Sequence, residues 1–286
     1  MKLCCIAASQ INTLIKETIM KKILSLALAA LLCTFSFASC SAKDENTITV
    51  AASSAPHAEI LEQCKAAMAE KGFNLEIKVM DDYIIPNTST DSGDVDANYF
   101  QHVPYLNQFN EENGTNLVAV AKVHYEPYAI YAGTCSSLDA LEDGASIAVP
   151  NDATNEARAL LLLEANGLIE LPEGAGLTVT KKDIVSNPKN LNILEMEAAL
   201  IPAQLDEVAL AVINGNYALA SGLDVNKALA AETADSEAAQ TYVNVLVVKA
   251  GNENKDGIEA LCEILLSDAI RDYINNTYNG AVVPIF

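Results

Sequence analysis

The chain has 286 residues, of which 51% are hydrophobic and 19% charged, and its formal net charge at pH 7 is −21. This length accommodates one large domain or two of moderate size. A surface so rich in carboxylates repels nucleic acid and, at long range, a strongly anionic solute. The composition therefore argues against a nucleic-acid partner and favours a zwitterionic or neutral ligand.

The N-terminal segment has the pattern of a lipoprotein signal peptide. Lys21-Lys22 precedes the apolar stretch Ile23–Ala38, which is shorter than the ~20 residues of a membrane-spanning helix. Phe37-Ala38-Ser39-Cys40 resembles a bacterial lipobox, with Phe37 in place of the usual Leu. We expect residues 1–39 to comprise a signal peptide preceded by an upstream extension, because Met20 opens the basic segment directly. Cys40 is then the lipidated residue, and residues 40–46 form a tether.

Alternating strands and helices are predicted from the first part of the mature chain. Thr47–Ser53 is expected to be a strand, His57–Lys71 a helix and Leu75–Met80 the next strand. Small residues follow the first strand, at its carboxyl end. In a β-α-β unit this is where a solute pocket forms.

Three cysteines fall within the mature domain, namely Cys64, Cys135 and Cys262. Their odd number and wide spacing do not indicate a disulfide framework. We expect them to pack as small apolar side chains, although one disulfide remains open. No zinc-ligand spacing is present, and we predict no bound metal.

An acidic run, Asp81–Asn98, follows the second strand and is interpreted mostly as a solvated face. Tyr83 is the exception, because it is an aromatic residue placed just beyond a strand end. Such a position allows its ring to face a pocket.

Further aromatic residues cluster in Asp96–Asn110. Phe100 and His102 are two residues apart and share a face if the chain is extended, while Pro104 opens a helix that includes Tyr105. These side chains either pack in the core, with His102 as a surface or capping group, or they line a pocket. The pocket interpretation gains weight because the chain is only 6% aromatic and has no Trp.

Two long strands suggest that the chain crosses between two lobes. Leu117–Tyr131 is apolar, β-branched and interrupted at Pro127, and it exceeds the usual strand length of ~3–10 residues. Tyr242–Lys249 is a second candidate crossing strand. We therefore predict an α/β protein whose first lobe comprises residues 44–126 and 242–286, and whose second lobe comprises residues 127–241.

Arg158 lies on the helix that follows the strand Ser146–Val149. Asp152 or Thr154 can cap this helix, and Arg158 lies about one turn inside it. Its side chain points back toward the helix N-terminus, where free N–H groups and a guanidinium together suit a carboxylate. No acidic residue lies three or four positions away. Its partner is therefore either a ligand or a distant carboxylate.

The rest of the chain continues the alternation. A buried strand, Val208–Ile213, ends at Asn214, whose amide either supports a turn or faces a ligand. The remaining predicted elements are a strand at Leu191–Leu194, helices at Ile201–Glu207 and Tyr217–Leu223, helix and loop over Ala228–Gln240, and one closing helix at Asp256–Tyr273.

Six long segments carry a resemblance to a known family. They are Asp82–Asn87, Asp94–Asn110, Lys122–Tyr131, Ile147–Leu171, Ala209–Ala218 and Tyr242–Val248. In these segments the chain resembles the NlpA/MetQ family of methionine-binding lipoproteins of bacterial ABC importers, and the likeness covers residues 47–286. It departs from the family at Cys135 and at Ser136–Asp139, where a charged, Lys-containing turn is expected.

This resemblance implies a type II-like, two-lobed periplasmic-binding-protein fold with two crossover strands, closing on one amino acid. It implies that Tyr83, Phe100, His102 and Tyr105 surround the methionine side chain. Arg158 would clamp the carboxylate, and Asn151, Asn155 and Asn214 are candidates for the polar end of the ligand. The chemistry agrees, because sulfur–aromatic contacts contribute ~0.3–1.5 kcal/mol each and Asn oxygens accept from an ammonium.

The resulting hypothesis is a monomeric receptor, anchored at Cys40, that captures L-methionine and delivers it to an ABC permease and its ATPase without a cofactor. Another small amino acid or a short methionine-containing peptide is an alternative ligand. A surface adhesin is also open. An enzyme is disfavoured because the sequence lacks G-x-S-x-G, P-loop and H-E-x-x-H motifs.

Overall fold

The computed structural model describes residues 46–233 and 240–286. The predicted signal peptide, the lipidation site Cys40 and nearly all of the predicted tether lie outside the described residues. The described residues belong to one compact unit, Glu45–Phe286. None of the helices in those two ranges combines the length and the apolar character that crossing a bilayer demands.

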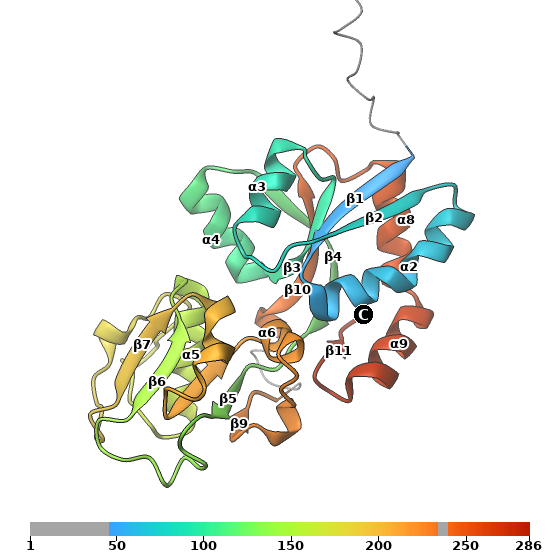
Figure 1. Cartoon of the computed structure of the whole chain (residues 1–286). Coiled ribbons are helices and arrows are strands. Elements are labelled where there is room, and N and C mark those ends of the chain that lie inside the picture. Colours follow the sequence, from blue (N-terminus) through green and yellow to red (C-terminus); the bar gives the residue numbers. More distant parts are fainter. Residues whose placement is uncertain (1–45, 234–239) are drawn as a thin grey trace, which may run out of the picture. The chain divides into compact units, whose positions relative to one another are not determined.

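The first sheet has six strands in the order β11-β4-β10-β3-β1-β2 (Figure 1). Strands β2 and β3 flank β1 in parallel, whereas β10 is antiparallel to both β3 and β4. The bounds are Thr47–Ala52 (β1), Asn74–Val79 (β2), Ala97–His102 (β3), Leu117–Tyr125 (β4), Val243–Lys249 (β10) and Val283–Pro284 (β11). The carboxyl end of β3 therefore lies beside the start of β10.

Helices cover both faces of this sheet. Alternation along β10 explains why, because Leu246 and Val248 join one core cluster and Val245 and Val247 join another. Helices α2 (Glu59–Glu70), α8 (Asp256–Leu265) and α9 (Asp268–Tyr278) pack on the first cluster, and α4 (Val103–Asn113) packs on the second. A short π-helical turn, η1 (Ser54–Ala58), precedes α2, and α3 (Ile85–Ser92) precedes β3.

The second sheet has five strands in the order β7-β6-β8-β5-β9. Strands β7 and β8 run parallel to β6, and β5 is antiparallel to β8. The strands are β5 (Ala129–Ala132), β6 (Ser146–Pro150), β7 (Asn192–Met196), β8 (Leu210–Ile213) and β9 (Ala230–Ala231). The helices are α5 (Ala153–Ala165), α6 (Gly215–Ala220) and the 3₁₀ turns η2 (Lys181–Asp183), η3 (Ala198–Gln204) and η4 (Val225–Lys227).

The chain passes from the first sheet to the second at Glu126-Pro127-Tyr128. The long predicted strand is thus two strands, because β4 belongs to the first sheet and β5 to the second. Proline lacks a backbone N–H and interrupts the ladder at this point. Strand β10 does not itself cross, since all of it pairs within the first sheet.

Several local predictions differ from the structure. The acidic run contains helix α3, which buries Pro86, Asn87 and Thr90. The predicted closing helix is two helices, because Ser267 is extended at φ −82°, ψ 157° and starts α9. The helix expected near Ile201 is the 3₁₀ helix η3, which contains Pro202. Within the described part of Ala228–Gln240, the structure has strand β9.

The cysteine alternative is also settled for the described residues, since Cys64, Cys135 and Cys262 are free thiols. Cys64 is fully buried within the core of the first sheet, as expected for a cysteine that packs as a small apolar side chain. Its burial raises the pKa of the thiol to about 12, which keeps it protonated and unreactive.

We predict that Gly133→Ala lowers the free energy of unfolding by about 1–3 kcal/mol, the usual cost of overpacking. A Cβ at Gly133 would lie 2.2 Å from the carbonyl oxygen of Val208 and 2.7 Å from that of Leu205, and backbone atoms cannot turn aside. Urea unfolding measures the effect. Gly176→Ala is the control, because a Cβ there meets nothing within 4 Å; equal stability of the two variants would contradict the prediction.

Candidate ligand-binding site

A cavity lies where residues of the two sheets face each other. Seven of the eight predicted site residues line it: Tyr83, Phe100, His102, Tyr105, Asn155, Arg158 and Asn214. The sequence did not single out the other lining residues, which are Gln101, Glu126, Gly215, Asn216 and Asn244.

Asn151 is the predicted residue that this cavity does not include. It is exposed at the end of β6 and borders an outer groove with Asp82 and Ile84. Helix α5 begins two residues later, and its N-cap is Asp152, whose side chain accepts from the backbone N–H of Asn155. Asn151 therefore lies outside the cavity, whereas Asn155, in the first turn of α5, lines it.

Aromatic rings form one end of the cavity. The ring centroid of Tyr83 lies 5.8 Å from that of Phe100, 5.6 Å from that of Tyr105 and 5.0 Å from that of Tyr217. The Tyr105 hydroxyl donates to the Tyr83 carbonyl oxygen at 2.8 Å, and the Tyr83 hydroxyl donates to Asn216 Oδ1 at 2.7 Å. These bonds occupy the polar atoms of both tyrosines and leave their rings to form an apolar wall.

His102 links the aromatic end to the polar end. It caps helix α4 by accepting the Tyr105 backbone N–H at Nδ1 (3.2 Å), so the ring proton resides on Nε2 and is donated to Asn155 Oδ1 (3.1 Å). Burial, with the nearby Arg158 charge as a smaller cause, lowers the pKa of His102 to about 3. His102 is therefore both a capping residue and a neutral donor at the cavity.

The amide of Asn214 is oriented by its neighbours. Its Nδ2 donates to Asn155 Oδ1 at 2.8 Å, and Asn155 Nδ2 donates in turn to Asp152 Oδ1 at 2.8 Å. The opposite end, Asn214 Oδ1, is buried and has no hydrogen-bond partner among the described residues. A buried acceptor left without a partner costs about 1–3 kcal/mol, so it provides a position for a ligand donor.

Arg158 lines the cavity and also has a distant carboxylate partner. Its Nε and Nη2 donate to the Glu232 carboxylate at 2.9 and 2.5 Å, and Nη2 also donates to the Glu126 carbonyl oxygen at 3.0 Å. The guanidinium carbon lies 4.2 Å from the Tyr242 ring centroid and 4.7 Å from that of Tyr128. The sequence left open whether Arg158 faces a ligand or pairs with a distant carboxylate. In the structure it pairs with Glu232 and also lines the cavity, so the two alternatives do not exclude each other.

The Arg158–Glu232 pair is buried on both sides, with side-chain exposures of 5% and 9%. Burial by itself would lower the pKa of Arg158, but the adjacent Glu232 carboxylate raises it above its ordinary value. The guanidinium therefore remains charged. Since Glu232 is 74 positions from Arg158, no local pattern could have revealed it.

Glu126 contributes a second carboxylate to the cavity. It is 6% exposed and receives the Nε2–H of His124 at 2.8 Å together with the backbone N–H of Asn216. Gly215 makes this position possible, because a Cβ there would lie 2.6 Å from both Cβ and Oε2 of Glu126. An acid within the apolar run Leu117–Tyr131, next to Pro127, was the sequence signal that could have identified it.

Together these residues form an apolar aromatic end opposite a polar end that holds both signs of charge. The polar end presents the guanidinium of Arg158, the carboxylate of Glu126 and the unpartnered oxygen of Asn214. Glu232 already balances Arg158, so the charges around the cavity do not favour an anion. This arrangement is suited to a zwitterion with an apolar side chain.

Two sheets with helices packed on them, and a cavity where they face each other, are the architecture of a substrate-binding protein of the two-lobed periplasmic-binding class, to which the similar structures also belong. The chain belongs to the NlpA lipoprotein family, whose sequence profile matches residues 48–286.

Known proteins are similar over nearly the whole described chain. A lipoprotein of Ruminococcus gnavus is 57% identical, with a TM-score of 0.83 and coverage of 84% of this chain and 100% of its own. The D-methionine-binding lipoprotein MetQ of Salmonella typhimurium is 40% identical over 263 residues, 90% of this chain and 96% of MetQ. A nutrient-binding protein of Burkholderia cenocepacia, whose structure has methionine bound, is 38% identical with a TM-score of 0.79, over 84% of this chain and 100% of its own.

The buried histidines predict that the protein loses stability in mild acid. Burial lowers the pKa of His57 to about 4, and those of His102 and His124 to about 3. Their contribution is fully present above pH 6.5 and falls as the pH drops below it, because only the unfolded imidazoles take up protons. Three such groups cost about 4 kcal/mol between pH 7 and pH 5.5. Glu126 opposes this trend, since burial raises its pKa.

Urea unfolding at several pH values tests this expectation. His102→Gln removes one of the three titrations, so its stability should depend on pH less steeply, by about 1.4 kcal/mol per pH unit below pH 6. The slope is diagnostic even if the substitution also lowers stability at pH 7. Parallel pH profiles for the two proteins would show that His102 is already charged in the folded state.

Proposed function

We propose that this protein is the solute receptor of an ABC-type importer and captures L-methionine between its two lobes. Its relatives include proteins named as D-methionine-binding and methionine-binding lipoproteins, and a methionine-bound structure. Lipidation at Cys40 would anchor the receptor on the extracytoplasmic side of the membrane. The receptor is proposed to act as a monomer. The ligand would pass from there to the permease with its ATPase.

The observation that carries this proposal is the buried oxygen Asn214 Oδ1, which has no hydrogen-bond partner among the described residues, in the cavity that the charged guanidinium of Arg158 also lines. In the proposed complex Nη1 of Arg158 donates to the ligand carboxylate, while Asn214 Oδ1 and the Glu126 carboxylate accept from the ammonium. Asn155 orients the Asn214 amide through the hydrogen bond at 2.8 Å. Asn151 is exposed outside the cavity and is omitted from this set.

The side chain of the ligand would lie against Tyr83, Phe100 and Tyr105, with His102 at the border. A thioether is polarizable and unbranched, so it adapts to aromatic walls and gains from sulfur–ring contacts. The rings already hold each other at centroid distances of 5.6–6.1 Å. Little ordering is then needed when the ligand enters.

The lobes are proposed to be residues 44–126 with 242–286, and residues 127–241. This division assigns each sheet to one lobe, because β1 to β4, β10 and β11 form the first sheet and β5 to β9 the second. Ligand contacts come from both lobes. Binding would therefore favour the closed arrangement.

Catalysis is the other function that the geometry raises. Ser53 Oγ lies 2.6 Å from His57 Nδ1, and His57 Nε2 lies 3.5 Å from Glu126, which is the order of a serine–histidine–acid series. Ser53 is buried and is not among the residues that line the cavity. A ligand in the cavity would not reach its hydroxyl, and we therefore favour binding over catalysis.

Native mass spectrometry of the purified protein should reveal a bound mass equal to that of methionine, since enclosed ligands dissociate slowly. In calorimetry, L-methionine should bind, norleucine should bind detectably, and glutamate should not bind because its second carboxylate would face Glu126 and the apolar wall. D-methionine and a methionyl dipeptide complete the panel. Tight glutamate binding would refute the site assignment.

Removing Arg158 should abolish most of the affinity for methionine. We expect Arg158→Ala to cost roughly 2–5 kcal/mol, or about 30-fold to several thousand-fold in Kd, because the ligand carboxylate loses its charged donor. The substitution also leaves Glu232 buried and unpaired, which costs about 3–5 kcal/mol of stability. The double variant Arg158→Met/Glu232→Gln avoids this penalty and serves as the matched protein. If it binds methionine within threefold of the original, Arg158 does not contact the ligand.

A further inference from the structure

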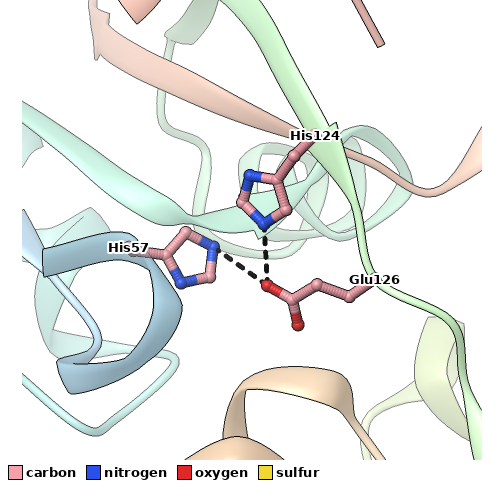
Figure 2. Close-up of side chains that lie close together, drawn as sticks. All are labelled: His57, His124 and Glu126. Carbon is pink, nitrogen blue, oxygen red and sulfur yellow. Dashed lines mark hydrogen bonds and ion pairs between the residues drawn. The ribbon is translucent and has the colours of Figure 1, made fainter. Parts of the chain in front are cut away.

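Two buried histidines converge on one oxygen of Glu126 (Figure 2). His124, on β4, donates from Nε2 to Oε1 at 2.8 Å, and His57, in η1, has Nε2 at 3.5 Å from the same atom. Their exposures are 0% and 1%. Neither histidine lines the cavity, whereas Glu126 does. Any effect of these rings on a ligand must therefore act through the carboxylate.

The hydrogen-bond partners determine where the ring protons lie. At His124, the Tyr99 hydroxyl bonds Nδ1, and at His57 the Ser53 hydroxyl bonds Nδ1 at 2.6 Å. Nε2 of His57 faces Asn244 Oδ1 at 2.9 Å, an atom that only accepts. Both rings are thus neutral and receive a hydroxyl proton at Nδ1. His124 donates its Nε2–H to Glu126, whereas His57 donates its Nε2–H to Asn244 and lies beside the Glu126 oxygen at 3.5 Å without donating to it.

This arrangement is complementary to an ionised carboxylate. Neutral rings donate hydrogen bonds without cancelling the negative charge, whereas two imidazolium ions would convert the cluster into a cation. Burial lowers the pKa of His57 to about 4 and that of His124 to about 3, so the neutral forms persist at neutral pH. Burial raises the pKa of Glu126, and the charge of Arg158 and the Asn216 backbone N–H oppose this rise and favour the carboxylate form.

A metal ion is the other occupant that two histidines and one carboxylate suggest, since their ligand atoms lie within 4.8 Å of one another. In that case both Nε2 atoms would have to be unprotonated. The contacts with Asn244 Oδ1 and Glu126 Oε1 instead account for a proton on each. The hydrogen-bond interpretation therefore accounts for the contacts of both Nε2 atoms.

We propose that His57 and His124 are positioning residues that hold the Glu126 carboxylate toward the ammonium group of the bound amino acid. This inference rests on the proposed function, because it assigns a role to the ammonium of the ligand. It predicts that the two histidines matter for ligands that carry the ammonium and not for ligands that lack it.

The test compares methionine with 4-(methylthio)butanoate, which keeps the thioether and carboxylate but has no amino group. His124→Phe keeps a ring but removes the donor, and it should weaken methionine binding at least tenfold. Binding of 4-(methylthio)butanoate should change less than threefold. His124→Gln restores an N–H at the end of the side chain and should recover most of the loss. His57→Gln likewise keeps an N–H donor at the second position and should bind methionine nearly as tightly as the unaltered protein.

Ile193→Val is the control for a general effect of altering the buried core, because Ile193 lies on the edge strand β7 of the second sheet and does not line the cavity. It should leave both affinities unchanged. Equal weakening of the two ligands by His124→Phe, or an unchanged methionine affinity, would overturn the proposal. If that variant does not fold, Tyr99→Phe replaces it, because loss of the hydroxyl frees the His124 tautomer and should selectively weaken methionine severalfold.

Two further outcomes separate this inference from its foundations. If the unaltered protein binds neither compound, the proposed function fails and the histidines are not at issue. If it binds methionine but every variant keeps the ratio of the two affinities, only the positioning role fails. Thermal stabilisation by added Zn²⁺ that His124→Phe abolishes would instead identify a metal site and overturn the proposal.

Discussion

The arrangement of the site depends on one buried guanidinium. Arg158 is 4% exposed, and a charge in that environment persists only if its donors are satisfied. Nε and Nη2 of Arg158 both donate to the Glu232 carboxylate, and Nη2 also donates to the Glu126 carbonyl oxygen. The rings of Tyr128 and Tyr242 lie against the guanidinium. The orientation of the guanidinium is therefore fixed, and a ligand that bonds Arg158, as proposed, would lose little affinity to ordering this side chain.

The same pair determines which net charge a ligand can carry. Glu232 cancels the charge of Arg158, and the three histidines near the cavity are held neutral by burial. Glu126 then leaves the surroundings negative overall. A zwitterion can satisfy both the guanidinium and the carboxylate, whereas a monoanion such as 4-(methylthio)butanoate satisfies only the guanidinium and should bind more weakly. Selectivity thus follows from the balance of buried charges as well as from shape.

The sequence predicted those features that depend on local patterns. Apolar β-branched runs gave the main strands, and the helix carrying Arg158 was predicted from its cap, because both effects act over a few residues. Helix α3 was missed, since its polar sequence buries only Pro86, Asn87 and Thr90. The break at Ser267 was missed because the apolar periodicity continues on both sides of it.

Contacts between distant residues could not be predicted in this way. The aromatic cluster was anticipated because Phe100, His102 and Tyr105 are close in the chain. Glu232 and the histidine pair were not, since His57 and His124 are 67 positions apart (124 − 57) and become neighbours only in the folded chain, where their ring centroids lie 5.0 Å apart. Glu126 was recognisable in principle as the acid beside Pro127, but its role depends on Gly215, whose missing side chain provides the space.

The crossing segment connects ligand recognition to the relation between the two lobes. Glu126 begins the passage between the sheets, and it receives hydrogen bonds from His124 of the first sheet and from the backbone of Asn216 beside the second. Its carbonyl oxygen also binds Arg158. One residue thus joins elements of both lobes through three hydrogen bonds, two to its carboxylate and one to its carbonyl. A ligand ammonium that bonds Glu126 would add to these interactions only when the lobes are together, and by linkage its binding energy would stabilise that closed arrangement.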